Sequence, residues 1–225
     1  MFDIAAIVSR AIALLLGLTV HEFSHAWMAL RMGDRTAKQA GRVTLNPLAH
    51  LDLSGAIMFL LLVLGMAPIA WGKPVPINPY YMRNRRWGVV LSTAAGPLSN
   101  LTLALVIAGF VRLIFTFIPG ALESLTPGPF LLIANLLIVN VALALFNLLP
   151  IPPLDGFHIL EAFAPPTWDR ALAFVHAYGP WILMALLFTG FLGGPNVLGM
   201  VLAPGQNVLF NWVLRLAFPG FPMLR

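Results

Sequence analysis

An H-E-x-x-H motif lies inside a hydrophobic stretch that is long enough to cross a lipid bilayer. The motif is His21-Glu22-Phe23-Ser24-His25, and the run from Ile4 to Leu30 contains only Arg10, Glu22 and the two histidines as ionisable groups. On an α-helix, histidines four residues apart lie on one face and can bind the same zinc ion. Glu22 is then placed to accept a proton from a water molecule on the zinc. Because a carboxylate at membrane depth is costly without a partner or a role, we predict a zinc site, with a chance match as the alternative.

The composition places the chain among membrane proteins. Hydrophobic residues make up 60% of the 225 residues and charged residues only 9%, which is more apolar surface than a soluble core of this size can bury. There is no cysteine, so any metal must be bound by His, Asp or Glu. The formal net charge of +5 does not come from a separate basic domain. We therefore expect no nucleic-acid partner and attribute the charge to membrane orientation.

Six apolar runs each reach, or come near, the ~20 residues that a membrane span requires. They are residues 4–30, 53–71, 87–118, 130–149, 171–192 and 197–218. The first has no basic leader and no small-residue cleavage site after it, so we interpret it as retained structure and not as a signal peptide. We predict a single membrane-embedded domain over residues 1–225, with a catalytic core at about 4–163 and C-terminal helices at about 169–218.

The basic residues indicate how these runs are oriented. If positive charge favours the cytoplasmic side, eleven of the thirteen basic residues face the cytoplasm: Arg31, Arg35, Lys38, Arg42, Lys73, Arg83, Arg85, Arg86, Arg170, Arg215 and Arg225. The 53–71 run then has basic flanks on the same side at both ends. A re-entrant hairpin or a tilted, partly spanning helix fits this charge pattern, and a normal span with one mis-sided basic loop is the alternative.

A catalytic zinc ion needs a third protein ligand and keeps one position for water. Our candidate is Asp155, which follows a helix break made by three prolines in Pro150-Ile151-Pro152-Pro153. If the first run crosses from outside to inside, His21 lies near the cytoplasmic side of the bilayer core. Asp155 reaches the same depth only if residues 53–71 do not span. Charge bias and metal geometry therefore favour the re-entrant interpretation.

Taken together, these motifs resemble those of the site-2 protease family of intramembrane zinc metalloproteases, over most of residues 10–163. Residues 21–25 match the family's zinc helix, Leu154-Asp155-Gly156 its third-ligand motif, and Gly96-Pro97-Leu98-Ser99-Asn100 a glycine-proline turn. Asn147 matches a position near the substrate, and residues 71–79 are similar to a segment of the small members. The chain departs from the family in lacking a soluble regulatory domain and in the 53–71 insertion, which lengthens the spacing between the zinc motifs.

The resemblance implies a hydrolase that cuts transmembrane protein substrates. One Zn²⁺ per chain, bound by His21, His25 and Asp155, would polarise the substrate carbonyl, while Glu22 takes a proton and returns it to the leaving amine. Asn147 and Asn100 are candidates for stabilising the oxyanion or holding the substrate backbone.

A transmembrane helix hides its peptide bonds in its own hydrogen bonds, so the substrate must unwind locally. An extended substrate could pair with a strand of the enzyme, and Lys73, Val75 and Ile77 alternate with prolines in a way that suits an edge strand. A plain proline-rich connector is the alternative. We expect His50 at the membrane surface and His158 to be a polar neighbour of the site.

The predicted fold is an all-α polytopic membrane protein. It has about five transmembrane helices, a re-entrant or partly spanning segment, and a short extended, β-like region beside the zinc site. We expect a multi-pass protein of a prokaryotic cell membrane with the zinc site towards the cytoplasm; the sequence sets no oligomeric state. One rival class is a zinc-binding scaffold or chaperone without protease activity, against which Glu22 argues. Another is a transporter, which would show inverted halves with matching helix breaks.

Overall fold

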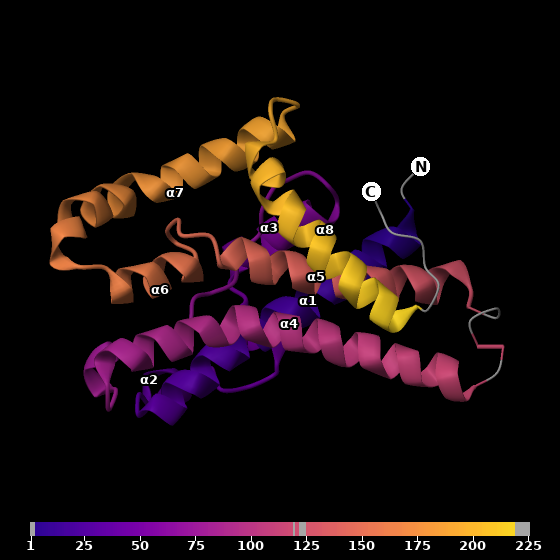
Figure 1. Cartoon of the computed structure of the whole chain (residues 1–225), viewed down its shortest axis with the longest axis horizontal. Helices are drawn as coiled ribbons and strands as arrows, with labels where there is room; N and C mark the ends of the chain where they lie inside the picture. Colours follow the sequence, from indigo (N-terminus) through magenta and orange to yellow (C-terminus); the bar gives the residue numbers. More distant parts are fainter. Residues whose placement is uncertain (1–2, 119, 122–124, 219–225) are drawn as a thin grey trace.

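The fold is known from a computed structural model, which describes residues 3–118, 120–121 and 125–218. Its α-helices are α1 (Ile4–Met32), α2 (Thr36–Gln39), α3 (Leu53–Val63), α4 (Arg85–Phe117), α5 (Pro127–Asn147), α6 (Asp155–Phe163), α7 (Asp169–Phe191) and α8 (Val197–Ala217). Short 3₁₀ turns occur at Pro47–His50, Pro79–Tyr81 and Pro166–Trp168. The all-α prediction is confirmed (Figure 1), and the described part of the chain contains no β-strand.

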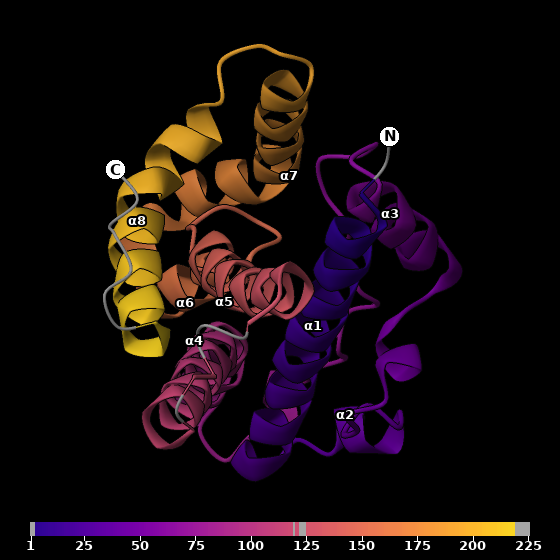
Figure 2. The ribbon, with the colours of Figure 1, turned by 90° about the vertical axis from the view of Figure 1, so that its right-hand side faces the viewer.

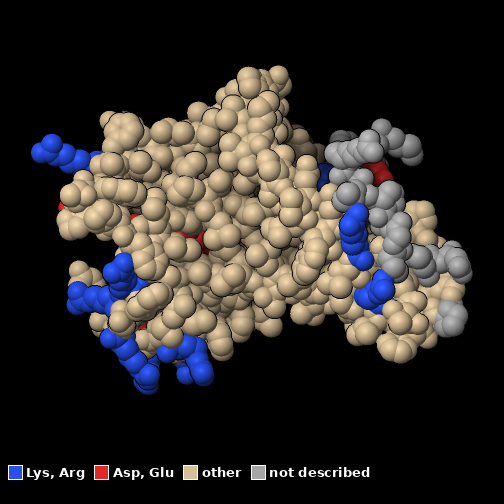
Figure 3. Space-filling model, viewed as in Figure 1, with Lys and Arg blue, Asp and Glu red and all other residues tan. Residues whose placement is uncertain are grey.

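Five of the described helices are long and apolar enough to cross a membrane: α1, α4, α5, α7 with its preceding turn, and α8. Large apolar side chains cover their outer faces, as expected for helices in contact with lipid, and examples are Val8, Phe110 and Trp181. Lys and Arg gather at the end of the molecule where α2 lies (Figure 3). This is a multi-pass membrane protein.

Helices α1, α4 and α5 form the centre of the molecule, with α5 enclosed by its neighbours (Figure 2). Small residues let the helices approach closely, as in other membrane bundles. At Gly17 of α1, an added Cβ would lie 2.8 Å from Leu143 of α5. At Gly96 of α4, an added Cβ would lie 2.4 Å from His25 of α1. The close approach of α4 to α1 therefore depends on the absence of a side chain at residue 96.

The 53–71 run does not form one continuous helix. Helix α3 covers only 11 residues, about 16 Å at ~1.5 Å per residue against the ~30 Å of a bilayer core. Gly65, at φ 74°, turns the chain back just after the helix. The Lys73 N–H then donates to the His50 carbonyl over 2.8 Å. The chain thus leaves and re-enters the body of the molecule at neighbouring points.

The predicted strand around Lys73, Val75 and Ile77 is not present as a paired strand. Residues 71–78 are an irregular connection between α3 and the turn at Pro79–Tyr81. The prolines at positions 74, 76 and 79 cannot donate backbone hydrogen bonds, which explains why the segment joins no sheet. We call residues 73–79 the connector.

The expectation that Arg215 lies at the same end of the molecule as most other basic residues is wrong. Leu198, in the first turn of α8, packs near Leu154, so α8 begins at the depth of the proline-broken segment. Val213 and Leu214 pack against Val111, near the end of α4, which is the end opposite to the basic one. The error arose because hydropathy gives the length of a run and not the depth at which α7 turns back. Arg225 lies outside the described residues.

Candidate active site

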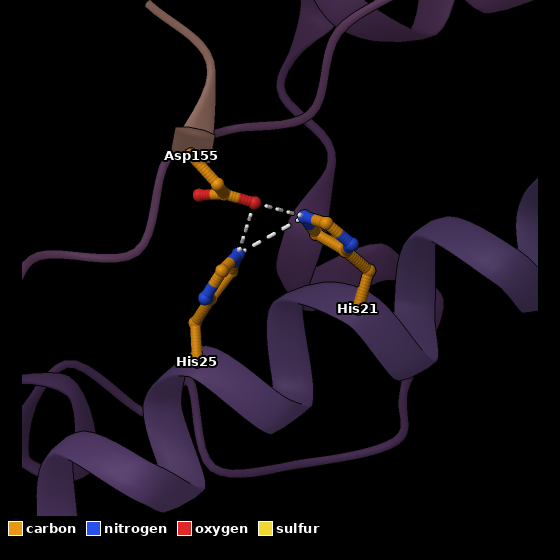
Figure 4. A group of neighbouring side chains, drawn as sticks. All are labelled: His21, His25 and Asp155. Carbon is orange, nitrogen blue, oxygen red and sulfur yellow. Dashed lines mark hydrogen bonds and ion pairs between the residues drawn. The ribbon is translucent and has the colours of Figure 1, made fainter. Parts of the chain in front are cut away.

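Three side chains that the sequence singled out converge beside α1 (Figure 4). His21 and His25 lie one turn apart on α1 and place their Nε2 atoms 3.0 Å from each other. The Asp155 Oδ2 atom lies 3.2 Å from the first Nε2 and 3.3 Å from the second. Both histidines are buried, and the Asp155 side chain is 16% exposed. The cluster therefore faces a partly enclosed space.

Each imidazole is held through its other nitrogen. The His21 Nδ1 lies 2.7 Å from the side-chain oxygen of Asn100, and the His25 Nδ1 lies 2.7 Å from the Ser92 carbonyl oxygen. A carbonyl oxygen only accepts hydrogen bonds, so each Nδ1 carries a hydrogen, and in the neutral imidazole Nε2 then keeps a free lone pair.

The three converging atoms are consequently all acceptors, and Asp155 Oδ2 is buried without a hydrogen-bond partner. Like lone pairs this close repel one another unless a cation lies between them. Two imidazoles and one carboxylate, with both imidazoles anchored through Nδ1, are the donor set and the outer support that catalytic zinc uses. The residues therefore fit a zinc ion.

The proline-rich break between α5 and α6 delivers Asp155 to the site. Asp155 is the first residue of α6. At Gly156 an added Cβ would lie 2.1 Å from the Leu148 carbonyl oxygen, so only glycine lets the chain fold back tightly enough. The break therefore places a carboxylate opposite the two histidines.

A cavity of about 400 Å³ opens on this cluster. Glu22 lines it beside the two histidines, and Asn147 lines it from the end of α5. The Asn147 amide donates to the Leu143 carbonyl over 2.9 Å, which leaves its oxygen available. The remaining lining residues come from α4, the proline-rich break, α6 and the connector: Val89, Ser92, Thr93, Pro153, Asp155, His158, Pro74, Val75, Ile77 and Pro79.

Two predicted site residues do not line the cavity. Lys73 is exposed and is not among the lining residues. Asn100 is fully buried behind His21, where its amide binds the imidazole as described above. His158 does line the cavity, and its Nδ1 lies 3.6 Å from a carboxylate oxygen of Glu161.

Two buried charged side chains that the sequence analysis missed hold the connector in place. The Arg42 guanidinium donates to the carbonyls of Lys73 and Pro74, each over 3.1 Å, and also to that of Ala49. The Asp34 carboxylate accepts from the Asn78 N–H over 2.6 Å. Neither residue belongs to a recognisable motif. The only indication in the sequence was an Asp and an Arg, without an evident partner, shortly after a membrane helix.

The neighbouring His50 is buried within the protein, with 2% of its surface exposed, and its position at the membrane surface stays a prediction. Its Nε2 contacts the Thr44 carbonyl over 2.9 Å, and its own carbonyl accepts from Lys73. The chain covers His50 because the segments that precede and follow α3 meet at this residue. Just before the connector, an added Cβ at Gly72 would lie 3.1 Å from the His50 carbonyl oxygen and 3.6 Å from a carboxylate oxygen of Glu22, so Glu22 lies beside this segment.

Comparison with known proteins supports a peptidase. Residues 116–189 match the model of Peptidase family M50, a stretch that contains Asn147 and Asp155. The chain is 37% identical over 200 residues to "Putative zinc metalloprotease YwhC" of Bacillus subtilis, with 88% of each protein covered. No solved structure matches the chain.

Two mycobacterial relatives are similar over a smaller part of their length. "Putative zinc metalloprotease Rip2" of Mycolicibacterium smegmatis is 37% identical over 177 residues, which are 78% of this chain and 64% of that protein. The protein of the same name from Mycobacterium tuberculosis H37Rv is 34% identical over 182 residues, which are 80% of this chain and 66% of that protein.

Proposed function

This chain belongs to peptidase family M50, the site-2 protease family of zinc metalloproteases, and on that premise we propose that it cleaves peptide bonds in or near the transmembrane segments of other membrane proteins. The observation that carries the proposal is the set of three facing acceptor atoms, His21 Nε2, His25 Nε2 and Asp155 Oδ2, opening with Glu22 onto one cavity. A purely structural zinc site would not require the Glu22 carboxylate.

We propose that His21, His25 and Asp155 hold one zinc ion per chain, which when bound would acidify a water molecule and polarise the scissile carbonyl. Glu22 accepts the proton of the attacking water and donates it to the leaving amine. The free side-chain oxygen of Asn147 accepts from the substrate backbone, or its amide turns to donate to the developing oxyanion.

The substrate reaches the site as an unwound segment, because an intact helix keeps its carbonyls hydrogen-bonded. The apolar side chains of Val75 and Ile77 face the same cavity as Glu22 and contact the residues that flank the scissile bond. The connector therefore contributes to the choice of substrate, while the α1 face performs the chemistry.

We further propose that α3 enters and leaves the membrane on the cytoplasmic side. Its 11 residues and the hydrogen bond between Lys73 and His50 support this, because a spanning segment would separate these two residues by the thickness of the bilayer. The zinc site then lies towards the cytoplasm. Single cysteines at Lys38 and Arg85 should react with an impermeant thiol reagent from the same side of sealed vesicles, and reaction from opposite sides would refute this topology.

The test of function compares wild type with Glu22→Gln in zinc content and in cleavage of a model transmembrane peptide. Glu22→Gln should retain zinc, since the ligands survive, and should lower the cleavage rate by roughly 10²–10⁴-fold, the usual contribution of general acid–base catalysis. Cleavage by Glu22→Gln at the wild-type rate would refute the role of Glu22. A wild-type protein that binds zinc but cleaves no peptide would instead support a scaffold.

A further inference from the structure

A chain of buried amides connects helix α5 to the metal cluster. Asn100 on α4 and Asn140 on α5 are both fully buried, within helices that lie at membrane depth. The Asn100 side-chain oxygen contacts His21 Nδ1 over 2.7 Å, and its amide nitrogen lies 2.9 Å from the side-chain oxygen of Asn140. Unpaired amides are costly in such surroundings, so the hydrogen bond between these two side chains needs a structural explanation.

Two backbone carbonyls determine which way the amides point. The Asn140 nitrogen donates to the Leu136 carbonyl over 2.8 Å, and the Asn100 nitrogen donates to the Gly17 carbonyl over 3.0 Å. Because these carbonyls can only accept, each amide presents its NH₂ group to them. The Asn140 oxygen must then accept from Asn100, and the Asn100 oxygen must face His21.

The direction of these hydrogen bonds therefore determines which nitrogen of the His21 imidazole carries the hydrogen. With an oxygen opposite Nδ1, His21 carries its hydrogen on Nδ1 and exposes a lone pair on Nε2 towards His25 and Asp155. A flipped Asn100 would oppose two donors at His21 or force the hydrogen onto Nε2, where it would block a metal. His25 has no such dependence, since its Nδ1 is anchored by the Ser92 backbone carbonyl.

We propose that Asn140 is a positioning residue of the zinc site, which acts through Asn100 to hold His21 in the tautomer that binds the metal. The proposal rests on the zinc site assigned above. It gives Asn100 a role behind the ligand instead of the substrate-binding role expected from the sequence. Asn140 touches neither the cavity nor the cluster, so its effect on metal binding can only be indirect.

The experiment measures zinc affinity of the purified full chain by competition with a chelator. Asn140→Leu removes the acceptor and should weaken zinc binding about tenfold, at the lower end of the range for outer partners of metal ligands. Asn140→Asp should restore affinity to within about threefold of wild type, because a carboxyl buried at that depth is protonated and reproduces both the acceptor and the donor. Rescue by Asp separates positioning from mere packing.

A matched control lies on the same helix. Asn135 is one and a half turns before Asn140 and donates to the Ser9 hydroxyl over 2.8 Å, away from the metal cluster. Asn135→Leu should leave zinc affinity unchanged. Should Asn140→Leu fail to fold, Asn140→Ala removes the same acceptor with a smaller side chain and must weaken zinc binding likewise.

Equal zinc affinities for the Asn140→Leu (or Ala) and Asn135→Leu variants would overturn the proposal, as would an Asn140→Asp variant no better than Leu. These outcomes leave the proposed function intact as long as wild type binds zinc and cleaves peptide. Absence of zinc from wild type would instead remove the proposed function and this inference together.

Discussion

The two sides of the cavity are built in different ways. On the α1 side, His21 and His25 are fixed by partners on α4, and regular helices carry both histidines and both partners. The connector, which also lines the cavity, has no regular structure of its own, and the side chains of Arg42 and Asp34 hold its backbone. In the proposed mechanism the chemistry therefore falls to the rigid side, and substrate contact falls to a segment whose position depends on a few long-range contacts.

The largest effect should follow from crowding the rigid side. Gly96→Ala would place a methyl group 2.4 Å from His25 Nε2 and 2.7 Å from a carbon of the His21 ring. Both imidazoles must then move, and displacements of about 1 Å at a reacting site cost about 10² in rate. We expect zinc loss together with a fall in cleavage of at least that size. Gly109→Ala, on the same helix with open space around it, is the control.

Removing the Arg42 side chain should lower cleavage without affecting zinc binding. Arg42→Met keeps much of the side-chain volume but loses the donors to the connector carbonyls. We expect cleavage to fall about tenfold, equivalent to ~1.4 kcal/mol of transition-state stabilisation, with zinc content unchanged. Metal analysis and cleavage assays on one preparation measure both. A parallel loss of zinc would mean that the connector and the metal cluster are not independent.

Asp34→Asn should have a smaller effect of the same kind. The substitution keeps the shape but replaces a charged acceptor of the Asn78 N–H with a neutral one, and hydrogen bonds to charged groups are worth about 1 kcal/mol more than neutral ones. Thermal unfolding should show a loss of about that size, with a few-fold slower cleavage and full zinc content. An unchanged unfolding midpoint and cleavage rate would show that Asp34 does not hold the connector.

The smallest effects should come from single side chains of the connector. Val75→Ala removes a cavity-lining group and should raise KM a few-fold, since each methylene in an apolar contact is worth about 1 kcal/mol. Lys73→Ala changes an exposed side chain outside the cavity and should leave KM unchanged. Steady-state kinetics on one model peptide compares the pair; a larger effect at Lys73 would reverse the assignment of faces.

The sequence predicted the site best where regular spacing along one helix brings the side chains together. The spacing of His21 and His25 indicates one helix face, and the depth argument pointed to Asp155, so the three side chains that the structure brings together were those singled out in advance. The 53–71 run was recognised as unusual from its flanking charges and from the equal depth that a shared zinc ion requires, although its helix is much shorter than the run.

Sequence reasoning failed where contacts join distant segments. Asn135, Asn140 and Asn147 all lie on α5, and no periodic pattern distinguishes the one that binds Asn100. Arg42 reads as another cytoplasmic charge because donation to backbone carbonyls leaves no mark in the partner's residue types. The turn at Gly193, where φ is 87°, leads into α8, and the depth at which α8 begins depends on the packing of Leu198 with Leu154 and Leu183, which are distant in sequence.

The assignment of Asp155 as a zinc ligand is tested most directly by replacing its carboxylate with a thiol. Since the chain has no cysteine, Asp155→Cys introduces a single sulfur ligand candidate, and zinc-edge X-ray absorption distinguishes sulfur from nitrogen and oxygen. We predict one sulfur scatterer at ~2.3 Å from zinc in Asp155→Cys, and none in wild type or in the control His158→Cys. A zinc-loaded Asp155→Cys protein whose metal is surrounded only by nitrogen and oxygen would contradict the assignment of residue 155 to the site.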